Sequence, residues 1–122
     1  MPNQDAVVWY LRVEQERTGS VMILTAAGRV SSLTCGQLNT ALESATDSPV
    51  RGVVLDLSGV DYISSPGLRS LETASARLAA RGRRLVVCGV KDAVGVAFDL
   101  AGLGASLAIE PSRPLAVERA GA

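Results

Sequence analysis

Short apolar stretches alternate with polar and amphipathic segments along most of the chain. Four of these stretches predict β-strands, and a weaker one at residues 106–109 predicts a fifth. Two of them, at residues 7–13 and 20–27, are rich in β-branched and large apolar side chains, and polar residues 14–19 predict a turn between them. The other two, residues 53–57 and 85–88, are nearly continuous apolar runs, which are typical of central strands covered on both faces.

The first predicted helix begins near Thr34 and ends at residues 47–49. Thr34 and Gln37 have the spacing of a capping box, in which each side chain satisfies a free backbone N–H. Leu33 and Leu38 flank this cap at the positions of a hydrophobic staple. Apolar side chains then recur at i, i+3, i+4 and i+7, which predicts one buried face; they are Leu38, Ala41, Leu42 and Ala45.

The second predicted helix follows a predicted loop at residues 58–64. Ser65 fits the cap position and Pro66 fits the first helical position, where its missing N–H costs nothing. Gly82 is placed to end this helix in a left-handed cap. The predicted inner stripe consists of Leu68, Leu71, Ser75 and Leu78.

Two further helices complete the expected fold. Asp92 is placed to cap a helix over residues 93–101 that ends at Gly102, and residues 114–120 predict a short terminal helix. Strands that alternate with helices predict an α/β fold with a mostly parallel sheet, an N-terminal hairpin and about four helices. The length of 122 residues suits one domain over residues 1–122, and we expect residues 1–5 and 118–122 to be loose ends.

Composition excludes several classes of function. Twelve basic and twelve acidic residues cancel, which argues against a nucleic-acid partner. Histidine is absent, so the commonest general base and metal ligand is missing. Cys35 and Cys88 form no CxxC pair, and we expect reduced thiols. No apolar run approaches the roughly 20 residues of a membrane span, and no signal pattern opens the chain, so we expect a cytoplasmic protein without membrane insertion.

Enzyme signatures are also missing from the sequence. There is no glycine-rich phosphate loop and no GxSxG motif. Asp56, Asp61 and Asp99 are scattered, as surface or helix-cap carboxylates are, and the basic residues of segment 81–84 suit a helix C-terminus. We therefore expect no catalysis, no cofactor and no metal site.

One ordered series of motifs resembles a known family. It consists of AGRV at residues 27–30, then VVLDLSGVDYISSPGLRSLETASARLAARGRRLVVCGV from residue 53, and finally a helix ending in DLAGL. The series is similar to the STAS domains of bacterial anti-sigma factor antagonists. The resemblance implies the STAS fold and a protein that switches between partners.

The resemblance also implies particular site residues and partners. The serine that a partner phosphorylates in such antagonists falls on Ser65, with Ser64 as the alternative. The kinase is the anti-sigma factor itself, of the histidine-kinase-like ATPase type, and a serine phosphatase resets the cycle. The implied partner-binding residues are Ser31, Ser64, Ser65, Pro66, Gly67, Leu68 and Arg69.

Independent physical reasoning supports the same turn. A helix start offers free N–H groups and a positive dipole end, so it accepts phosphate well. The alternative is that Ser65 merely caps the helix. The chain also departs from the family, since Ser31 and Ser64 stand where the family carries acids and Pro66 replaces a hydroxyl residue. We therefore infer less repulsion around a phosphate on Ser65.

Two questions stay open at this point. Val96 and Leu100 of the third helix either extend the partner surface or pack into the core with Phe98. The second possible function keeps the fold without the switch: a non-phosphorylated STAS scaffold, or a cytoplasmic component of a lipid or anion transport system.

Overall fold

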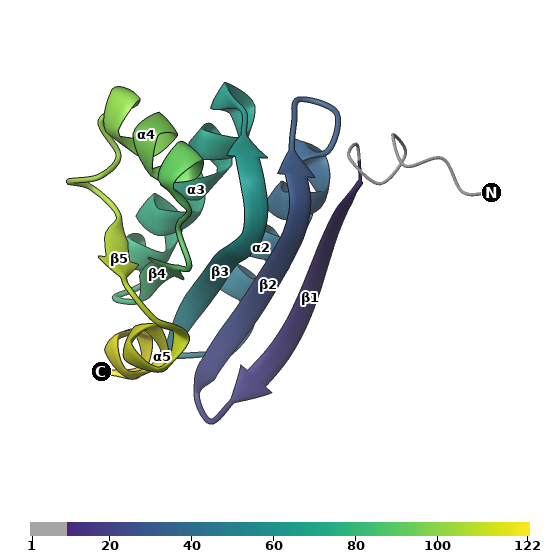
Figure 1. Cartoon of the computed structure of the whole chain (residues 1–122). Helices are drawn as coiled ribbons and strands as arrows, with labels where there is room; N and C mark the ends of the chain where they lie inside the picture. The colour runs from purple at the N-terminus through teal and green to yellow at the C-terminus, as the bar shows by residue number, and fades with distance from the viewer. Residues whose placement is uncertain (1–9) are drawn as a thin grey trace.

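An antiparallel hairpin opens the computed structural model, which describes residues 10–122 (Figure 1). Strands β1 (Leu11–Thr18) and β2 (Val21–Val30) are joined by a two-residue turn in which Gly19 has φ 59°. The predicted turn at residues 14–19 was therefore wrong, because most of that segment is strand. Its polar side chains belong to an edge strand with one solvated face. The parts of the predictions on residues 1–5 and 7–9 lie outside the described residues.

Within residues 10–122, five strands form one sheet in the order β1-β2-β3-β4-β5. Strands β3 (Gly52–Ile63), β4 (Arg84–Cys88) and β5 (Ala108–Glu110) continue it, each parallel to its neighbour. The predicted loop at residues 58–64 was wrong, since β3 runs on to Ile63 after a register shift and pairs again with β2. The mixed sheet with an N-terminal hairpin is confirmed.

Helices cover the two faces of the sheet unequally (Figure 1). Helices α2 (Cys35–Asp47), α3 (Ser65–Ala80) and α4 (Asp92–Leu100) lie on one face, over the larger apolar core. Helix α5 (Arg113–Gly121) lies on the other face, over a smaller core at β2, β3 and β4. The larger core includes Leu24, Leu55, Leu57, Leu71 and Phe98.

The C-terminal helix is packed, in contrast to the loose end expected at residues 118–122. Ala120 is only 1% exposed and belongs to the smaller core. An added Cβ at Gly52 would lie on the backbone of Ala120, so the start of β3 and the end of α5 are in direct contact. Small residues at both positions allow this close approach.

Helix ends agree with the sequence in part. Gly82 has φ 70°, and the N–H of Arg83 donates to the carbonyl of Leu78, so the predicted left-handed end of α3 is confirmed. In the inner stripe, Ala74 is buried in place of Ser75. The cap of α4 is Lys91, with Asp92 in the first turn.

The predicted capping box and staple of α2 were wrong. The hydroxyl of Thr34 donates to the carbonyl of Arg29 at 2.6 Å and accepts from the N–H of Ser31 at 2.9 Å. It therefore closes the turn before the helix and makes no cap bond to α2. Leu33 is 85% exposed, so it forms no staple.

No helix in the described part of the chain is long and apolar enough to cross a membrane.

Candidate functional site

The carboxyl ends of β2 and β3 lie side by side where α3 begins. Val30 pairs with Ile63, and the N–H of Ser64 donates to the carbonyl of Val30 at 2.7 Å. The turn that starts at Ser31 and the turn at Ser64 therefore share one edge of the sheet, as parallel strands require. Loops at this edge are accessible to partners.

Ser64 is the N-cap of α3, and the prediction of Ser65 in that position was wrong. Ser64 has extended backbone geometry, and its hydroxyl accepts from the N–H of Gly67 at 3.3 Å. It is only 8% exposed. The Ser64 hydroxyl therefore stabilises the helix start by satisfying a free backbone N–H.

Ser65 is the first residue of α3 and is exposed. No described residue forms a hydrogen bond with its hydroxyl. Pro66 follows in the first turn, where its missing N–H leaves no bond unmade. Of the two candidate phosphoacceptors, Ser65 thus presents an accessible hydroxyl, whereas the hydroxyl of Ser64 is buried and engaged.

Gly67 and Leu68 pack the start of α3 against the strands. A Cβ added at Gly67 would lie 2.6 Å from Cγ1 of Val30 and 2.9 Å from Cγ1 of Ile63. Leu68 is buried in the larger core. These two predicted partner-binding residues therefore face the interior, while Pro66 and Arg69 are exposed.

Ser31 is held in a local hydrogen-bond network. Its hydroxyl accepts from the N–H of Leu33 at 3.2 Å and lies 3.3 Å from the hydroxyl of Thr34. Ser31 is buried, so it shapes the turn beside α3 more than it forms surface. The structure thus brings all seven predicted residues to one edge but exposes only Ser65, Pro66 and Arg69.

A hollow of about 310 Å³ lies between the first turn of α3 and the end of α4. Ser64 and Ser65 line it on one side, and Tyr62 and Leu100 contribute exposed apolar surface to it. The sequence left Leu100 open between surface and core; it is 85% exposed, and Val96 one turn earlier on α4 is also exposed, whereas Phe98 is buried. This surface extends the site toward α4.

Tyr62 was missed by the sequence analysis because its segment was taken for a loop. The guanidinium of Arg29 stacks on the Tyr62 ring, 4.5 Å from its centroid. Such a cation–π contact holds the ring in place beside the hollow. A register shift separates Val60 from Tyr62, so apolar and polar residues do not alternate regularly here and the sequence gives no clear strand signal.

A second hollow of about 310 Å³ lies on the other side of α3, against α2. Its lining residues are Cys35, Gly36, Asn39, Pro66, Arg69, Ser70 and Thr73. The first turn of α3 therefore stands between two open depressions.

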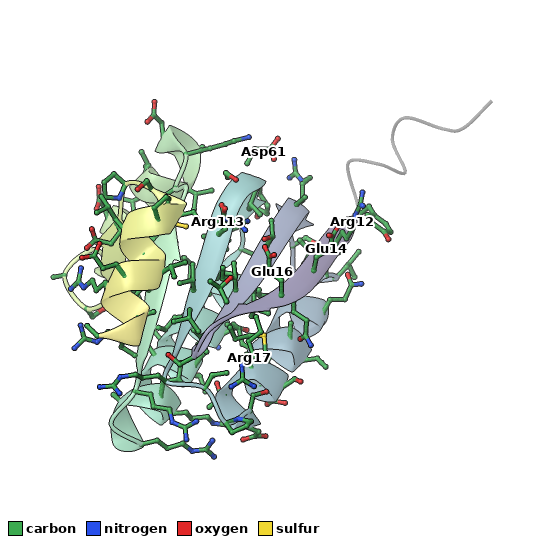
Figure 2. All side chains as sticks on the ribbon, turned by 90° about the horizontal axis from the view of Figure 1, so that it is seen from below. Arg12, Glu14, Glu16, Arg17, Asp61 and Arg113 are labelled. Atoms are coloured by element: carbon green, nitrogen blue, oxygen red, sulfur yellow. The ribbon has the colours of Figure 1, made fainter. Side chains whose placement is uncertain are left out.

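A separate polar cluster fastens α5 to the opposite face of the sheet. The Arg113 guanidinium donates to Asp56 at 3.0 Å, to Glu16 at 2.8 Å and to Thr25 at 2.6 Å. Figure 2 shows Arg113 reaching from α5 toward the charged side chains of β1. Burial alone would raise the pKa of Asp56, but hydrogen bonds from Ser58 and Arg113 hold that pKa below its ordinary value. The interpretation of Asp56 as a surface or cap carboxylate was wrong.

The basic residues of segment 81–84 act on a neighbouring helix. Arg81 donates to the carbonyl of Thr46 at 2.7 Å, and Arg83 donates to the carbonyl of Ser48 at 2.9 Å. Both carbonyls lie at the C-terminus of α2, where cations are favourable. The cluster therefore has a structural role at α2, rather than only at its own helix as expected.

The remaining candidate chemistry is sparse. Both cysteines are free thiols, and burial raises the pKa of Cys88 to about 11, aided by the nearby charge of Asp56. Within residues 10–122, no group of three or more histidine, cysteine, aspartate or glutamate side chains is placed to hold a metal ion. The site is therefore an exposed serine between two hollows.

Comparison with known proteins identifies the family to which this fold belongs. The model of the STAS domain family matches residues 12–116, so the chain belongs to that family. A curated relative in Bordetella bronchiseptica, BtrV, is named as an anti-sigma factor antagonist. It is 31% identical over 106 residues, which cover 87% of this chain and 91% of the relative.

Solved structures share the fold. An anti-sigma factor antagonist from Mycobacterium paratuberculosis matches with a TM-score of 0.83 and 21% identity, over 91% of this chain and 94% of that one. The antagonist SpoIIAA in its unphosphorylated form matches with a TM-score of 0.75 and 16% identity, over 88% and 95%. SpoIIAA of Bacillus in its phosphorylated form matches with a TM-score of 0.68 and 15% identity, over 88% and 98%. The chain is thus an anti-sigma factor antagonist-like STAS protein.

Proposed function

We propose that this protein binds an anti-sigma factor and that phosphorylation of Ser65 by that partner switches the binding off. The partner acts as a serine kinase of the histidine-kinase-like ATPase type, and a serine phosphatase restores the unmodified state. Phosphorylation acts on a binding surface here, so the protein itself needs no catalytic group.

The exposure of Ser65 is the observation that carries this proposal. A kinase must bring the hydroxyl of its substrate into its own active site, and Ser65 offers a free hydroxyl at the surface. Ser64 would first have to give up its bond to Gly67 and leave its buried position. A phosphate adds a charge of about −1.5 to −2, which would change this surface without refolding the core.

The surface around Ser65 has the chemistry of a transient protein interface. The hollow beside it presents Tyr62 and Leu100, and Val96 is exposed one turn before Leu100. Tyrosine is a frequent hot-spot residue in protein interfaces, and contiguous exposed apolar surface marks protein interaction sites. A phosphate at the rim of this apolar surface would have to be desolvated when the partner docks, which opposes binding.

The second candidate function is a STAS scaffold, or a cytoplasmic component of a lipid or anion transport system, without phosphorylation. The two serines that stand in place of the family's acids, Ser31 and Ser64, and the presence of Pro66 favour it. In this structure Pro66 occupies a first-turn position where it costs no hydrogen bond. Pro66 is therefore compatible with the switch as well.

The test uses isothermal titration calorimetry to compare the binding of four forms of the chain to the anti-sigma factor kinase. We expect Ser65→Ala to bind like the parent chain, and Ser65→Asp to bind at least tenfold more weakly. Ser44→Asp is the matched control, because Ser44 is an exposed helical serine on α2 that lines neither hollow, and we expect it to bind like the parent chain. Equal affinities of Ser65→Asp and Ser65→Ala would refute the switch and favour the scaffold.

A further inference from the structure

Arg69 lies one helical turn beyond Ser65 on α3, and both residues are exposed. Side chains four residues apart on a helix share a face, with Cβ atoms about 6 Å apart. Helical side chains also extend back over the preceding turn, toward the N-terminus. The guanidinium of Arg69 is therefore within reach of a group attached to the hydroxyl of Ser65.

The two hollows beside α3 are lined by one cation and no carboxylate. Among the residues that line the two hollows beside α3, Arg69 is the only charged one in the part of the chain that the structure describes. Neither α2 nor α3, both described in full, has an acidic residue in its first turn. The first turn of α3 is thus electrostatically open to an added anion.

The carboxylates nearest to Arg69 in the described part of the chain are not paired with it. Glu72 is three residues further along α3, and Asp61 and Asp99 each adjoin a residue that lines the hollow toward α4. None of these three carboxylates lines either hollow, and within residues 10–122 none forms an ion pair with Arg69. Among the described residues, Arg69 therefore has no ion pair that must break when a phosphate arrives.

We propose that Arg69 pairs with the phosphate on Ser65 and so stabilises the phosphorylated form of the protein against dephosphorylation. The inference rests on the proposed function, because it requires a phosphate at that hydroxyl. A planar guanidinium matches two phosphate oxygens with parallel hydrogen bonds. The pair favours the dianionic phosphate, and it must open before a phosphatase takes the phosphate into its own site.

The experiment uses the full chain with phosphoserine placed at position 65 by genetic code expansion, so no kinase is needed. Arg69→Gln removes the charge, Arg69→Lys keeps it without the planar fork, and Arg77→Gln is the matched control. Arg77 lies two turns further along the same helix and pairs with Glu43 at 3.6 Å. The measurements are a ³¹P NMR pH titration of the phosphoserine and the rate of phosphate release by alkaline phosphatase.

We expect Arg69→Gln to raise the second pKa of the phosphate and to speed phosphate release about twofold, the effect typical of a helical pair of this spacing. We expect Arg69→Lys to give values between those of the parent chain and Arg69→Gln. Arg77→Gln should leave the phosphate pKa and the release rate unchanged. Circular dichroism checks that each variant is folded. We expect all of them to fold, because both arginines are exposed.

Equal pKa values and release rates for Arg69→Gln and Arg77→Gln would overturn the pairing. That result leaves the proposed switch intact, because the phosphate was installed without a kinase. Conversely, a failure of the kinase to modify Ser65 would refute the switch, whatever the installed phosphoserine shows.

Discussion

Replacing Gly67 by alanine tests how closely α3 is seated on the strands that end beside Ser65. The added Cβ would lie 2.6 Å from Cγ1 of Val30 and 2.9 Å from Cγ1 of Ile63. Both neighbours are buried and β-branched, so their side chains have few alternative rotamers. The start of the helix must therefore move away from the sheet.

The expected cost follows from two opposing effects. Overpacking a core typically lowers stability by about 1–3 kcal/mol. Exchanging glycine for alanine in a helix raises stability by at most about 1 kcal/mol. We predict that Gly67→Ala lowers the free energy of unfolding by about 1–2 kcal/mol. For a chain of this length that corresponds to a fall in Tm of roughly 4–8 °C.

Urea and thermal denaturation followed by circular dichroism measure both quantities. Gly36→Ala is the matched control, because Gly36 lies in the first turn of α2 and an added Cβ there would meet nothing within 4 Å. We expect that variant to be unchanged or about 0.5 kcal/mol more stable. A Gly67→Ala protein as stable as Gly36→Ala would refute the claim that α3 packs tightly against Val30 and Ile63 at Gly67.

Three further predictions concern stability and reactivity. Ser64→Ala should lower the free energy of unfolding by about 1 kcal/mol through loss of the cap, whereas exposed Ser65→Ala should change it by less than about 0.5 kcal/mol; equal urea midpoints would contradict this difference. Because the pKa of Asp56 is below its ordinary value of 3.8, its ionised form contributes stability above that pH that is lost as the pH falls toward the folded-state pKa. Asp56→Asn should therefore be less stable at pH 7 and lose less stability than the parent between pH 5 and 3 in urea melts, and parallel acid limbs would speak against it. With a pKa of about 11 and a buried position, the thiol of Cys88 should resist iodoacetamide at pH 8 until the protein unfolds, while half-buried Cys35 reacts first; the reverse order in a mass-spectrometric time course would contradict the structure.

Local patterns in the sequence predicted the apolar strands and the periodic helices well. Residues 53–57 and 85–88 are nearly continuous apolar runs, and they form central parts of β3 and β4. Edge strand β1 was misread beyond Val13, because one of its faces is solvated and its polar residues resemble a turn. The end of β3 was missed because two register shifts, one between Asp56 and Gly59 and one between Val60 and Tyr62, break its alternation.

The cap of α3 was predicted to within one residue, and the surroundings of that turn were not predicted. Ser64 and Ser65 are adjacent residues with cap-forming side chains, so the sequence alone does not decide which one accepts the Gly67 N–H. Contacts between distant segments leave no local pattern in the sequence. One example is the ion pair between Asp56 and Arg113, which are 57 residues apart. The same holds for Tyr62 and Leu100, which meet at one hollow only through the fold.

The identity of the phosphorylated residue tests the central claim most directly. Tandem mass spectrometry of the protein purified from the organism that makes it, with Ser65→Ala and Ser64→Ala versions expressed in parallel, locates the phosphate. The structure predicts phosphate on Ser65, retained in Ser64→Ala and absent from Ser65→Ala. Phosphate on Ser64, or phosphate that persists in Ser65→Ala, would contradict the account.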